Sequence, residues 1–145
     1  MANDAPNLAS PVTSDARAMV AAARMEAALA VYDGRGGRAV CAAFADVLDE
    51  VVRAKVVAAG NAMPPGLAVL ATGGWGRRET CPYSDIDLLF LTATPPDDHV
   101  RALAERVLYP LWDDGLEVGH AVRSTVEAIA LAADAPLQHV LHAQL

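Results

Sequence analysis

Apolar residues recur at helical spacing between residues 38 and 59. Phe44, Leu48 and Val51 lie on one stripe of this segment, and acidic side chains occupy much of the other side. This pattern is typical of an amphipathic helix that buries one face. Glycine and two prolines follow within a few positions, so we expect the helix to end near residue 59 and the chain to turn.

Other segments carry helix signals of a different kind. An alanine-rich run follows a polar start near residue 15, and Ser124 stands three positions before Glu127, which is a capping-box pattern. Pro110 lies inside a third apolar repeat and is expected to bend or loosen its last turn. These signals predict helices over residues 15–31, 94–112 and 124–133, and a further helical stretch over 134–145.

Three short apolar runs indicate strands. Residues 67–72 and 85–92 are bounded by turn-forming residues, and residues 116–122 alternate well enough for a third strand. Residues 73–84 are rich in glycine and polar side chains, so we predict a loop there. Helices interleaved with a few strands indicate a small α/β domain.

The ends of the chain differ in character from its middle. Residues 1–13 are small, polar and proline-bearing, which favours disorder, and residues 33–38 read as a glycine-rich linker. We therefore divide the chain into a leader, helix and linker (1–37) and a folded domain (38–145). The last helical pattern stops at Leu145 without a cap, so we expect the domain to be truncated at this end.

Composition narrows the classes of protein that fit. The 145 residues suit one domain, and the 54% hydrophobic content overstates the core because 31 residues are alanine. The net charge of −7 and the single lysine, Lys55, argue against general binding to nucleic acid or anionic membranes. Cys41 and Cys81 form neither a disulfide framework nor a metal-type spacing. Without a secretory signal or a long apolar run, the expected location is the cytoplasm.

The segment from residue 67 to residue 92 carries the most specific chemistry. On a strand, Asp85 and Asp87 point to the same side while Ile86 enters the core. Two carboxylates so placed suit the Mg²⁺ ions of a two-metal phosphoryl-transfer site. Gly73 and Gly74, at the end of the preceding strand, would let backbone N–H groups approach a phosphate.

Each of these features alone is common in surface turns and solvated strand ends. Arginine at positions 77 and 78 adds cations that could neutralise phosphate charge. The ordered combination of strand, Gly-Gly, paired arginines, Asp-x-Asp and second strand is much rarer than its parts, and it favours a nucleotide site.

The same segment resembles the signature of the DNA polymerase beta-type nucleotidyltransferase superfamily. It is more narrowly similar to the PII-protein uridylyltransferase family, which reads Gly-Gly-Tyr/Trp-Gly-Arg-x-Glu-x-x-Pro-x-Ser-Asp-x-Asp-Leu-Leu. A second block resembles that family's Leu-Trp-Asp and Leu-Glu-Val-Gly-His-x-Val-Arg. The matching positions are Gly73, Gly74, Trp75, Gly76, Arg77, Glu79, Pro82, Ser84, Asp85, Asp87, Leu88 and Leu89, then Leu111, Trp112, Asp113, and Leu116 to Arg123.

The resemblance covers about residues 38–145 and implies a fold, a reaction and partners. The implied fold is a nucleotidyltransferase core with a small mixed sheet and flanking helices. The implied reaction transfers UMP from UTP to a tyrosine of the PII nitrogen-signalling protein and releases pyrophosphate. Family members also carry HD and ACT domains, which 145 residues cannot hold.

The resemblance also assigns roles to individual residues. Asp85 and Asp87 would hold Mg²⁺ or Mn²⁺, and Gly73 and Gly74 would position the triphosphate. Arg77 and Ser84 would assist with the phosphates. The catalytic residues expected from the resemblance are therefore the two aspartates.

One departure from the family pattern concerns a third carboxylate. His142 and Gln144 stand where relatives carry an acidic residue and an arginine, and a neutral histidine is a poor ligand for Mg²⁺. Glu117 is another candidate for the third ligand. Two alternatives therefore stay open: a nucleotidyltransferase with another acceptor, or a weakened nucleotide-binding fragment.

The remaining polar residues give weaker signals. We expect His120 to be a hydrogen-bonded core histidine rather than a catalytic base, and Arg123 to pair with Glu127 one helical turn later. Trp75 suits base stacking and core packing equally well, and Cys81 receives no redox role.

Overall fold

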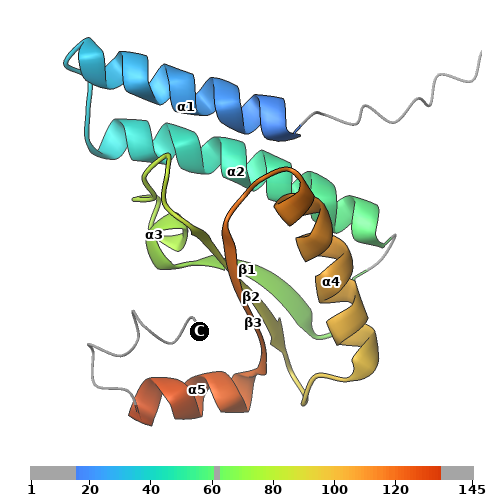
Figure 1. Cartoon of the computed structure of the whole chain (residues 1–145). Helices are drawn as coiled ribbons and strands as arrows, with labels where there is room; N and C mark the ends of the chain where they lie inside the picture. The colour runs from blue at the N-terminus through green and yellow to red at the C-terminus, as the bar shows by residue number, and fades with distance from the viewer. Residues whose placement is uncertain (1–15, 61–62, 135–145) are drawn as a thin grey trace, which may run out of the picture.

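The computed structural model describes residues 16–60 and 63–134. The chain runs through helices and strands that alternate in its second half (Figure 1). The elements in order are α1 (Ala16–Tyr32), α2 (Arg38–Ala59), β1 (Leu67–Thr72), α3 (Gly73–Gly76), β2 (Ile86–Thr92), α4 (Asp98–Asp113), β3 (Val118–Ser124) and α5 (Thr125–Asp134).

The three strands form one mixed sheet in the order β1-β2-β3. The central strand, β2, runs antiparallel to β1 and parallel to β3. The parallel pair needs a crossover, which α4 supplies. In this register Asp87 lies between Thr72 on β1 and Gly119 on β3. The predicted α/β fold with a small mixed sheet is confirmed.

Side chains of β2 divide between two environments because they alternate along the strand. Ile86, Leu88 and Phe90 are buried in one cluster with residues of α2 and α4. Asp87 and Leu89 point to the other side of the sheet and are half-buried. Helices α2 and α4 therefore cover one sheet face, and Asp87 lies on the other face.

Helix α1 lies along α2 and contributes to the same core (Figure 1). Its buried residues are small: Ala16, Val20 and Ala23 contact the cluster that contains Phe44 and Leu48. Small side chains let two helices approach closely, which suits the alanine-rich composition.

Helices α1, α2 and α5 and strand β1 agree with their predicted positions to within a residue or two at each end. The predicted loop at 73–84 was incomplete, because its first four residues form the one-turn helix α3. The third strand is displaced by two residues from the predicted 116–122. Leu116 instead closes α4 through an N–H bond to the Leu111 carbonyl, and pairing with β2 extends β3 to Ser124.

The capping box at the start of α5 is present. The Ser124 N–H donates to Glu127 Oε2 at 2.7 Å, and the Glu127 N–H donates back to Ser124 Oγ at 3.2 Å. The predicted leader (1–13) and the helical stretch after residue 134 lie outside the described residues. No helix within residues 16–60 and 63–134 is long and apolar enough to cross a membrane.

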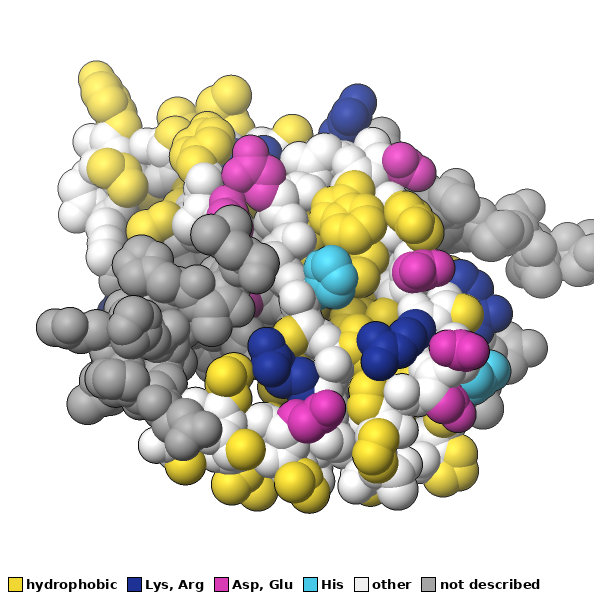
Figure 2. Space-filling model, turned by 60° about the horizontal axis from the view of Figure 1, so that its bottom comes forward, with side chains coloured by type: hydrophobic (Ala, Val, Ile, Leu, Met, Phe, Trp, Pro, Cys, Tyr) yellow, Lys and Arg dark blue, Asp and Glu magenta, His cyan; other side chains and the backbone are white. Residues whose placement is uncertain are grey.

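Hydrophobic and charged side chains mix on the side of the molecule that lies at the bottom of Figure 1. Figure 2 turns this side forward and shows hydrophobic groups between basic and acidic ones. Helix α5 contributes two strongly exposed residues, Val126 at 72% and Ile129 at 70%.

Candidate nucleotide site

An open hollow of about 460 Å³ lies where β1 ends and β2 begins. Its wall combines a glycine, two hydroxyl groups, a thiol and three carboxylates. The lining residues are Gly74, Glu79, Thr80, Cys81, Ser84, Asp85 and Asp87. The structure thus brings four of the six predicted site residues to one surface: Gly74, Ser84, Asp85 and Asp87.

The two aspartates reach the hollow because the residue between them is fixed in the core. Ile86 is buried, and its N–H donates to the Glu117 carbonyl at 3.0 Å, which starts the pairing with β3. Asp85 precedes the strand and is exposed, whereas Asp87 is half-buried. Two carboxylates of different exposure therefore face the same space.

Gly73 and Gly76 are required by the backbone around them. Gly73 has a φ of +57°, and a Cβ atom there would overlap the Asp87 carboxylate. A Cβ on Gly76 would lie 2.6 Å from the Ala71 carbonyl oxygen. Gly74 differs, since its φ is not positive and its Cβ would make ordinary contact with Thr80 at 3.5 Å. Gly73 shapes the site through the room it leaves for Asp87.

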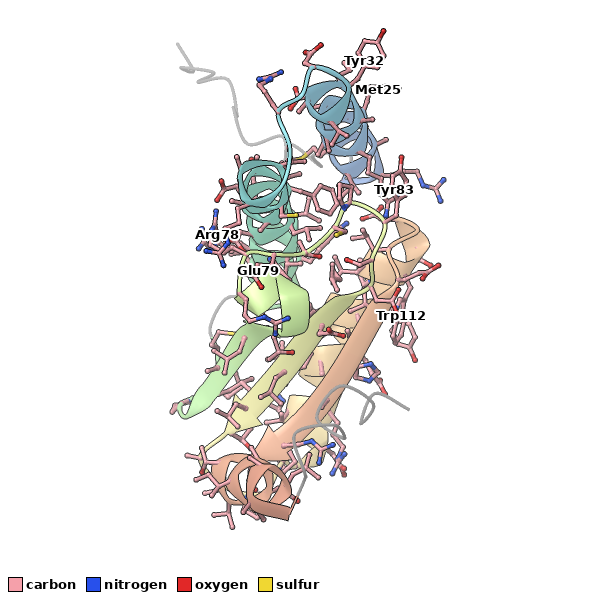
Figure 3. All side chains as sticks on the ribbon, turned by 90° about the vertical axis from the view of Figure 1, so that its left-hand side faces the viewer. Met25, Tyr32, Arg78, Glu79, Tyr83 and Trp112 are labelled. Carbon is pink, nitrogen blue, oxygen red and sulfur yellow. The ribbon has the colours of Figure 1, made fainter. Side chains whose placement is uncertain are left out.

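Residues of α2, which are not part of the family signature, bind the side chains of the glycine turn. Trp75 is buried, and its Nε1–H donates to Asp49 Oδ1 at 3.0 Å. Arg78 has a φ of +59° and is bound to the Ala42 carbonyl and to the carboxylate of Asp46. The hydrogen bond and charge of Asp46 raise the pKa of Arg78. Figure 3 shows Arg78 turned toward α2.

The turn before Asp85 is held by hydroxyl groups. Thr80 is buried, and its Oγ1 shares a hydrogen bond of 3.0 Å with Ser84 Oγ. Ser84 donates from both Oγ and N to the Cys81 carbonyl, at 2.8 and 3.1 Å. Ser84 therefore has a structural role in the turn as well as a place in the wall of the hollow.

Helix α1 also contacts this turn. Arg24 Nε donates to the Pro82 carbonyl at 2.7 Å, and its guanidinium lies 5.1 Å from the centre of the Tyr83 ring. Tyr83 lies on the α1 side of the molecule in Figure 3. A residue far upstream of the signature therefore supports the turn.

Arg77 lies apart from the lining of the hollow. Its side chain is 61% exposed, and its Nε lies 3.4 Å from Glu79 Oε2. Glu79 is also paired with Arg38 on α2. Hydrogen bonds from Arg38 and then Arg77 lower the pKa of Glu79. Arg38 and Arg77 thus already share an anionic partner, the Glu79 carboxylate.

Several proteins are similar to this chain in amino-acid sequence. A protein of Bradyrhizobium diazoefficiens, a bifunctional uridylyltransferase/uridylyl-removing enzyme, is 40% identical over 124 residues, which cover 80% of this chain and 13% of that protein. A protein of the same name in Aromatoleum aromaticum is 39% identical over 120 residues, which cover 82% of this chain and 14% of that protein. A third, in Mycobacterium tuberculosis, is 45% identical over 73 residues, which cover 50% of this chain and 9% of that protein.

The chain belongs to the uridylyltransferase/uridylyl-removing enzyme family. The resemblance inferred from the signature is therefore confirmed. The chain spans only 9% to 14% of the length of these relatives. No family model and no solved structure matches it.

The third carboxylate in the wall of the hollow, Glu79, is paired with Arg38 and Arg77 and does not complete a metal site with the two aspartates. Across residues 16–60 and 63–134, no three His, Cys, Asp or Glu side chains form a group able to hold a metal ion. Glu117 contributes its backbone carbonyl to Ile86 and does not line the hollow. His142 and Gln144 lie outside the described residues.

Two expectations about the second family block were wrong. His120 is exposed and packs edge-on against Trp112, with ring centres 5.6 Å apart, so it is not a core histidine. Glu127 is bound by Ser124 rather than paired with Arg123, because the capping box uses its carboxylate. Trp75, for which two roles stayed open, is a buried packing residue.

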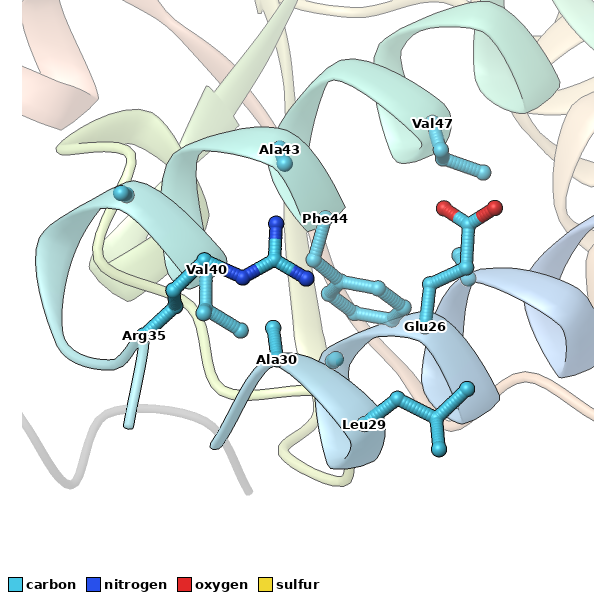
Figure 4. Close-up of a pocket in the computed structure, with 11 residues that line it drawn as sticks. Glu26, Leu29, Ala30, Arg35, Val40, Ala43, Phe44 and Val47 are labelled. Atoms are coloured by element: carbon cyan, nitrogen blue, oxygen red, sulfur yellow. The ribbon is translucent and has the colours of Figure 1, made fainter. Parts of the chain in front are cut away.

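A second cavity of about 480 Å³ lies between α1 and α2 (Figure 4). Phe44 lies among its mostly aliphatic lining residues, and Glu26 and Arg35 are its charged members. It contains none of the signature residues of the family. The signature residues Gly74, Ser84, Asp85 and Asp87 line the hollow at β2 instead.

Several residues that hold the turn beside the hollow could not be identified from the sequence. Asp46 and Asp49 read as an ordinary solvated helix face, and Arg24 read as part of a separate leader. The available signal was indirect: a buried tryptophan beside a glycine turn needs an acceptor for its indole N–H. The partner could not be named without the fold.

Proposed function

We propose that the chain is the nucleotide-transfer part of a uridylyltransferase. In this proposal UMP passes from UTP to a tyrosine hydroxyl of the PII signalling protein, and pyrophosphate leaves. The observation that carries the proposal is that Asp85 and Asp87 face one hollow with Gly74 and Ser84, in a chain 40% identical to named uridylyltransferases.

The donor set of the hollow fits a hard divalent cation. Carboxylate oxygens are the ligands that Mg²⁺ and Mn²⁺ prefer, and the room left by Gly73 lets Asp87 turn into this space. Asp85 and Asp87 would hold the cation. A bound Mg²⁺ would supply charge neutralisation for the phosphates and the pyrophosphate leaving group.

The chain's own groups would bind and orient the nucleotide. Gly74 gives the wall a section without a side chain, so a triphosphate can approach the backbone. The Ser84 hydroxyl lies beside Asp85 and would donate to a phosphate by leaving the Cys81 carbonyl, to which it donates in this structure. Arg77 would reach a phosphate by leaving Glu79, which exchanges one anionic partner for another.

The transfer itself would be a displacement at the α-phosphorus of UTP. The tyrosine oxygen of PII forms the new P–O bond, and the bond to the pyrophosphate oxygen breaks. Positioning and electrostatic stabilisation carry most of such a reaction. The partners are thus UTP and PII, with no role for nucleic acid or membrane given the net charge of −7, and the expected location is the cytoplasm.

Nucleotide binding tests the assignment of the two aspartates. Asp87→Asn should weaken Mg²⁺-dependent binding of UTP by at least about tenfold, the equivalent of ~1.4 kcal/mol, measured by titration calorimetry. The matched control is Asp98→Asn, an exposed aspartate in the first turn of α4. Equal affinity of wild type and Asp87→Asn would overturn the assignment.

A second candidate is a nucleotide-binding fragment with little transfer activity. His142 at the expected acidic position favours it, since misplacing the attacking oxygen by ~1 Å costs roughly 100-fold in rate. Incorporation of labelled UMP into PII separates the two candidates. Robust labelling by the unmodified chain supports the transferase, whereas labelling that appears only with His142→Asp supports the weakened fragment.

A further inference from the structure

Two thiols that are forty positions apart in the sequence meet beside the hollow. Cys41 lies in the first turns of α2 and is half-buried, and Cys81 is exposed in the wall of the hollow. The segment that leads to Cys81 is bound to the first turns of α2, through Arg38 with Glu79 and through Arg78 with the Ala42 carbonyl, and the Cys81 side chain is close enough to influence the pKa of Cys41. They are therefore neighbours in the fold, although their spacing in the sequence gives no sign of it.

Contacts on both sides keep the two thiols together. Arg38, three residues before Cys41, is paired with Glu79. The Ala42 carbonyl, one residue after Cys41, accepts from Arg78 Nη2 at 3.1 Å. These contacts hold the segment before Cys81 against the start of α2, so the proximity of the thiols does not depend on the thiols themselves.

The electrostatic surroundings of Cys41 agree with this arrangement. Burial, together with the charge and hydrogen bond of Cys81, raises the pKa of the Cys41 thiol, and the charge of Glu79 raises it further. Cys41 thus tends to stay a thiol, and the solvent-exposed Cys81 is the group that a dissolved reagent meets first.

We propose that Cys41 and Cys81 form a reversible disulfide bond when the chain meets a small-molecule disulfide such as oxidised glutathione. This proposal does not depend on the proposed nucleotide transfer. The bond would join α2 covalently to the turn that precedes Asp85.

The chemistry is a two-step thiol–disulfide exchange. The Cys81 thiolate attacks one sulfur of oxidised glutathione, forms a mixed disulfide and releases one glutathione thiolate. Cys41 gives its proton to solvent and attacks the Cys81 sulfur, which releases the second glutathione. The two protein thiols lose two electrons, and one small disulfide is reduced to two thiols.

The bond would act on a turn that is already ordered by Ser84. Ser84 donates two hydrogen bonds to the Cys81 carbonyl, so Cys81 is tied to the residue beside Asp85. A disulfide requires the sulfurs to approach to about 2.05 Å, so the exposed Cys81 side chain would have to turn toward Cys41. The closed loop would contain β1 and α3, which limits the unfolded chain and raises the unfolding temperature.

The test exposes the dilute, purified 145-residue chain to a glutathione redox buffer. We expect wild type to lose both titratable thiols, to lose two hydrogens from its intact mass and to yield a Cys41–Cys81 cross-linked peptide. Reduction with dithiothreitol should restore both thiols. Cys41→Ala should instead keep one glutathione on Cys81, which shows that Cys41 resolves the mixed disulfide.

Three outcomes would overturn the proposal. Wild type could accumulate the same mixed disulfide on Cys81 as Cys41→Ala does, it could form only covalent dimers, or it could keep both thiols where Cys41→Ala is modified. Cys41→Ser provides a second variant in case alanine disturbs α2. Circular dichroism of the variants before oxidation establishes that they are folded.

Discussion

The carboxylate of Asp87 occupies the space in which Gly73 would carry a side chain. Any Cβ at position 73 would overlap Asp87 Oδ2, and the φ of Gly73 is +57°. The glycine at the end of β1 and the aspartate on β2 are thus two parts of one packing arrangement. The Gly-Gly signature serves the carboxylate directly, in addition to any role toward phosphate.

The first prediction follows from this contact. Gly73→Ala should displace Asp87, lower Mg²⁺-dependent UTP affinity by about tenfold or more, and destabilise the chain by about 1–3 kcal/mol through the positive φ. Gly66→Ala is the matched control: Gly66 also has a positive φ, +80°, but lies at the other end of β1 beside Ala93. Calorimetry and thermal unfolding measure the two effects. Equal affinity losses in both variants would mean that backbone strain, and not Asp87, is responsible.

A second prediction concerns the support from α2. Asp49→Ala removes the acceptor of the buried Trp75 indole and one of the carboxylates beside Arg78. We expect a loss of about 1–3 kcal/mol in the free energy of unfolding, the cost of an unsatisfied buried donor. Glu50→Ala, at the next and exposed position of α2, should change stability by less than ~0.5 kcal/mol. Urea denaturation followed by tryptophan fluorescence compares them.

The third prediction concerns α1. Arg24→Gln removes the bond to the Pro82 carbonyl and the contact with Tyr83. The amide of Ser84, which bonds to the Cys81 carbonyl, should then exchange with solvent about fivefold faster, the equivalent of a ~1 kcal/mol hydrogen bond. Arg17→Gln is the control, because Arg17 contacts the end of α4 instead. Unchanged exchange at Ser84 would show that the turn is held without α1.

The fourth prediction is a pH dependence at the start of α5. Hydrogen bonds from the Ser124 N–H and then the Ser124 hydroxyl lower the pKa of Glu127 below its ordinary 4.5. A lowered pKa in the folded state adds stability above the ordinary pKa, and this stability is lost as the pH falls through the folded-state value. Glu127→Gln keeps an acceptor but cannot titrate.

We therefore expect the unfolding temperature of wild type to exceed that of Glu127→Gln near neutral pH, and the difference to shrink as the pH falls below about 4.5. Glu105→Gln, which changes an exposed carboxylate on α4, gives the baseline. A difference that stays constant across this range would remove Glu127 from the pH dependence of stability.

The sequence located most elements because their boundaries have local causes. Helix α2 lies between the glycines at positions 37 and 60, and the Ser124–Glu127 pair fixes the start of α5. The end of β3 has no local cause. Arg123 and Ser124 continue the strand because Leu91 and Thr92 of β2 are opposite them, so pattern alone predicted that the strand ends too early, at residue 122.

The candidate site was predictable in its carboxylates but not in its supports. Asp85 and Asp87 stand two positions apart on a recognisable strand, and alternation alone places them on one side. Asp49, Arg24 and Cys41 reach the site only through tertiary packing, and each lies on a helix that looks unremarkable in sequence. Local patterns cannot report contacts that depend on how α1 and α2 dock.

The dependence of the signature on α2 has a consequence for protein engineering. Residues 73–87 cannot be transferred alone, because two of their side chains are bound by α2. The Trp75 indole donates to Asp49, and the Arg78 guanidinium donates to the Ala42 carbonyl. Transplanting the signature into another scaffold would leave an indole donor and a guanidinium without their acceptors. A chimaera would therefore also need the part of α2 that carries Asp46 and Asp49. A homologue without these two aspartates would keep the motif but lose the contacts that hold it in this arrangement.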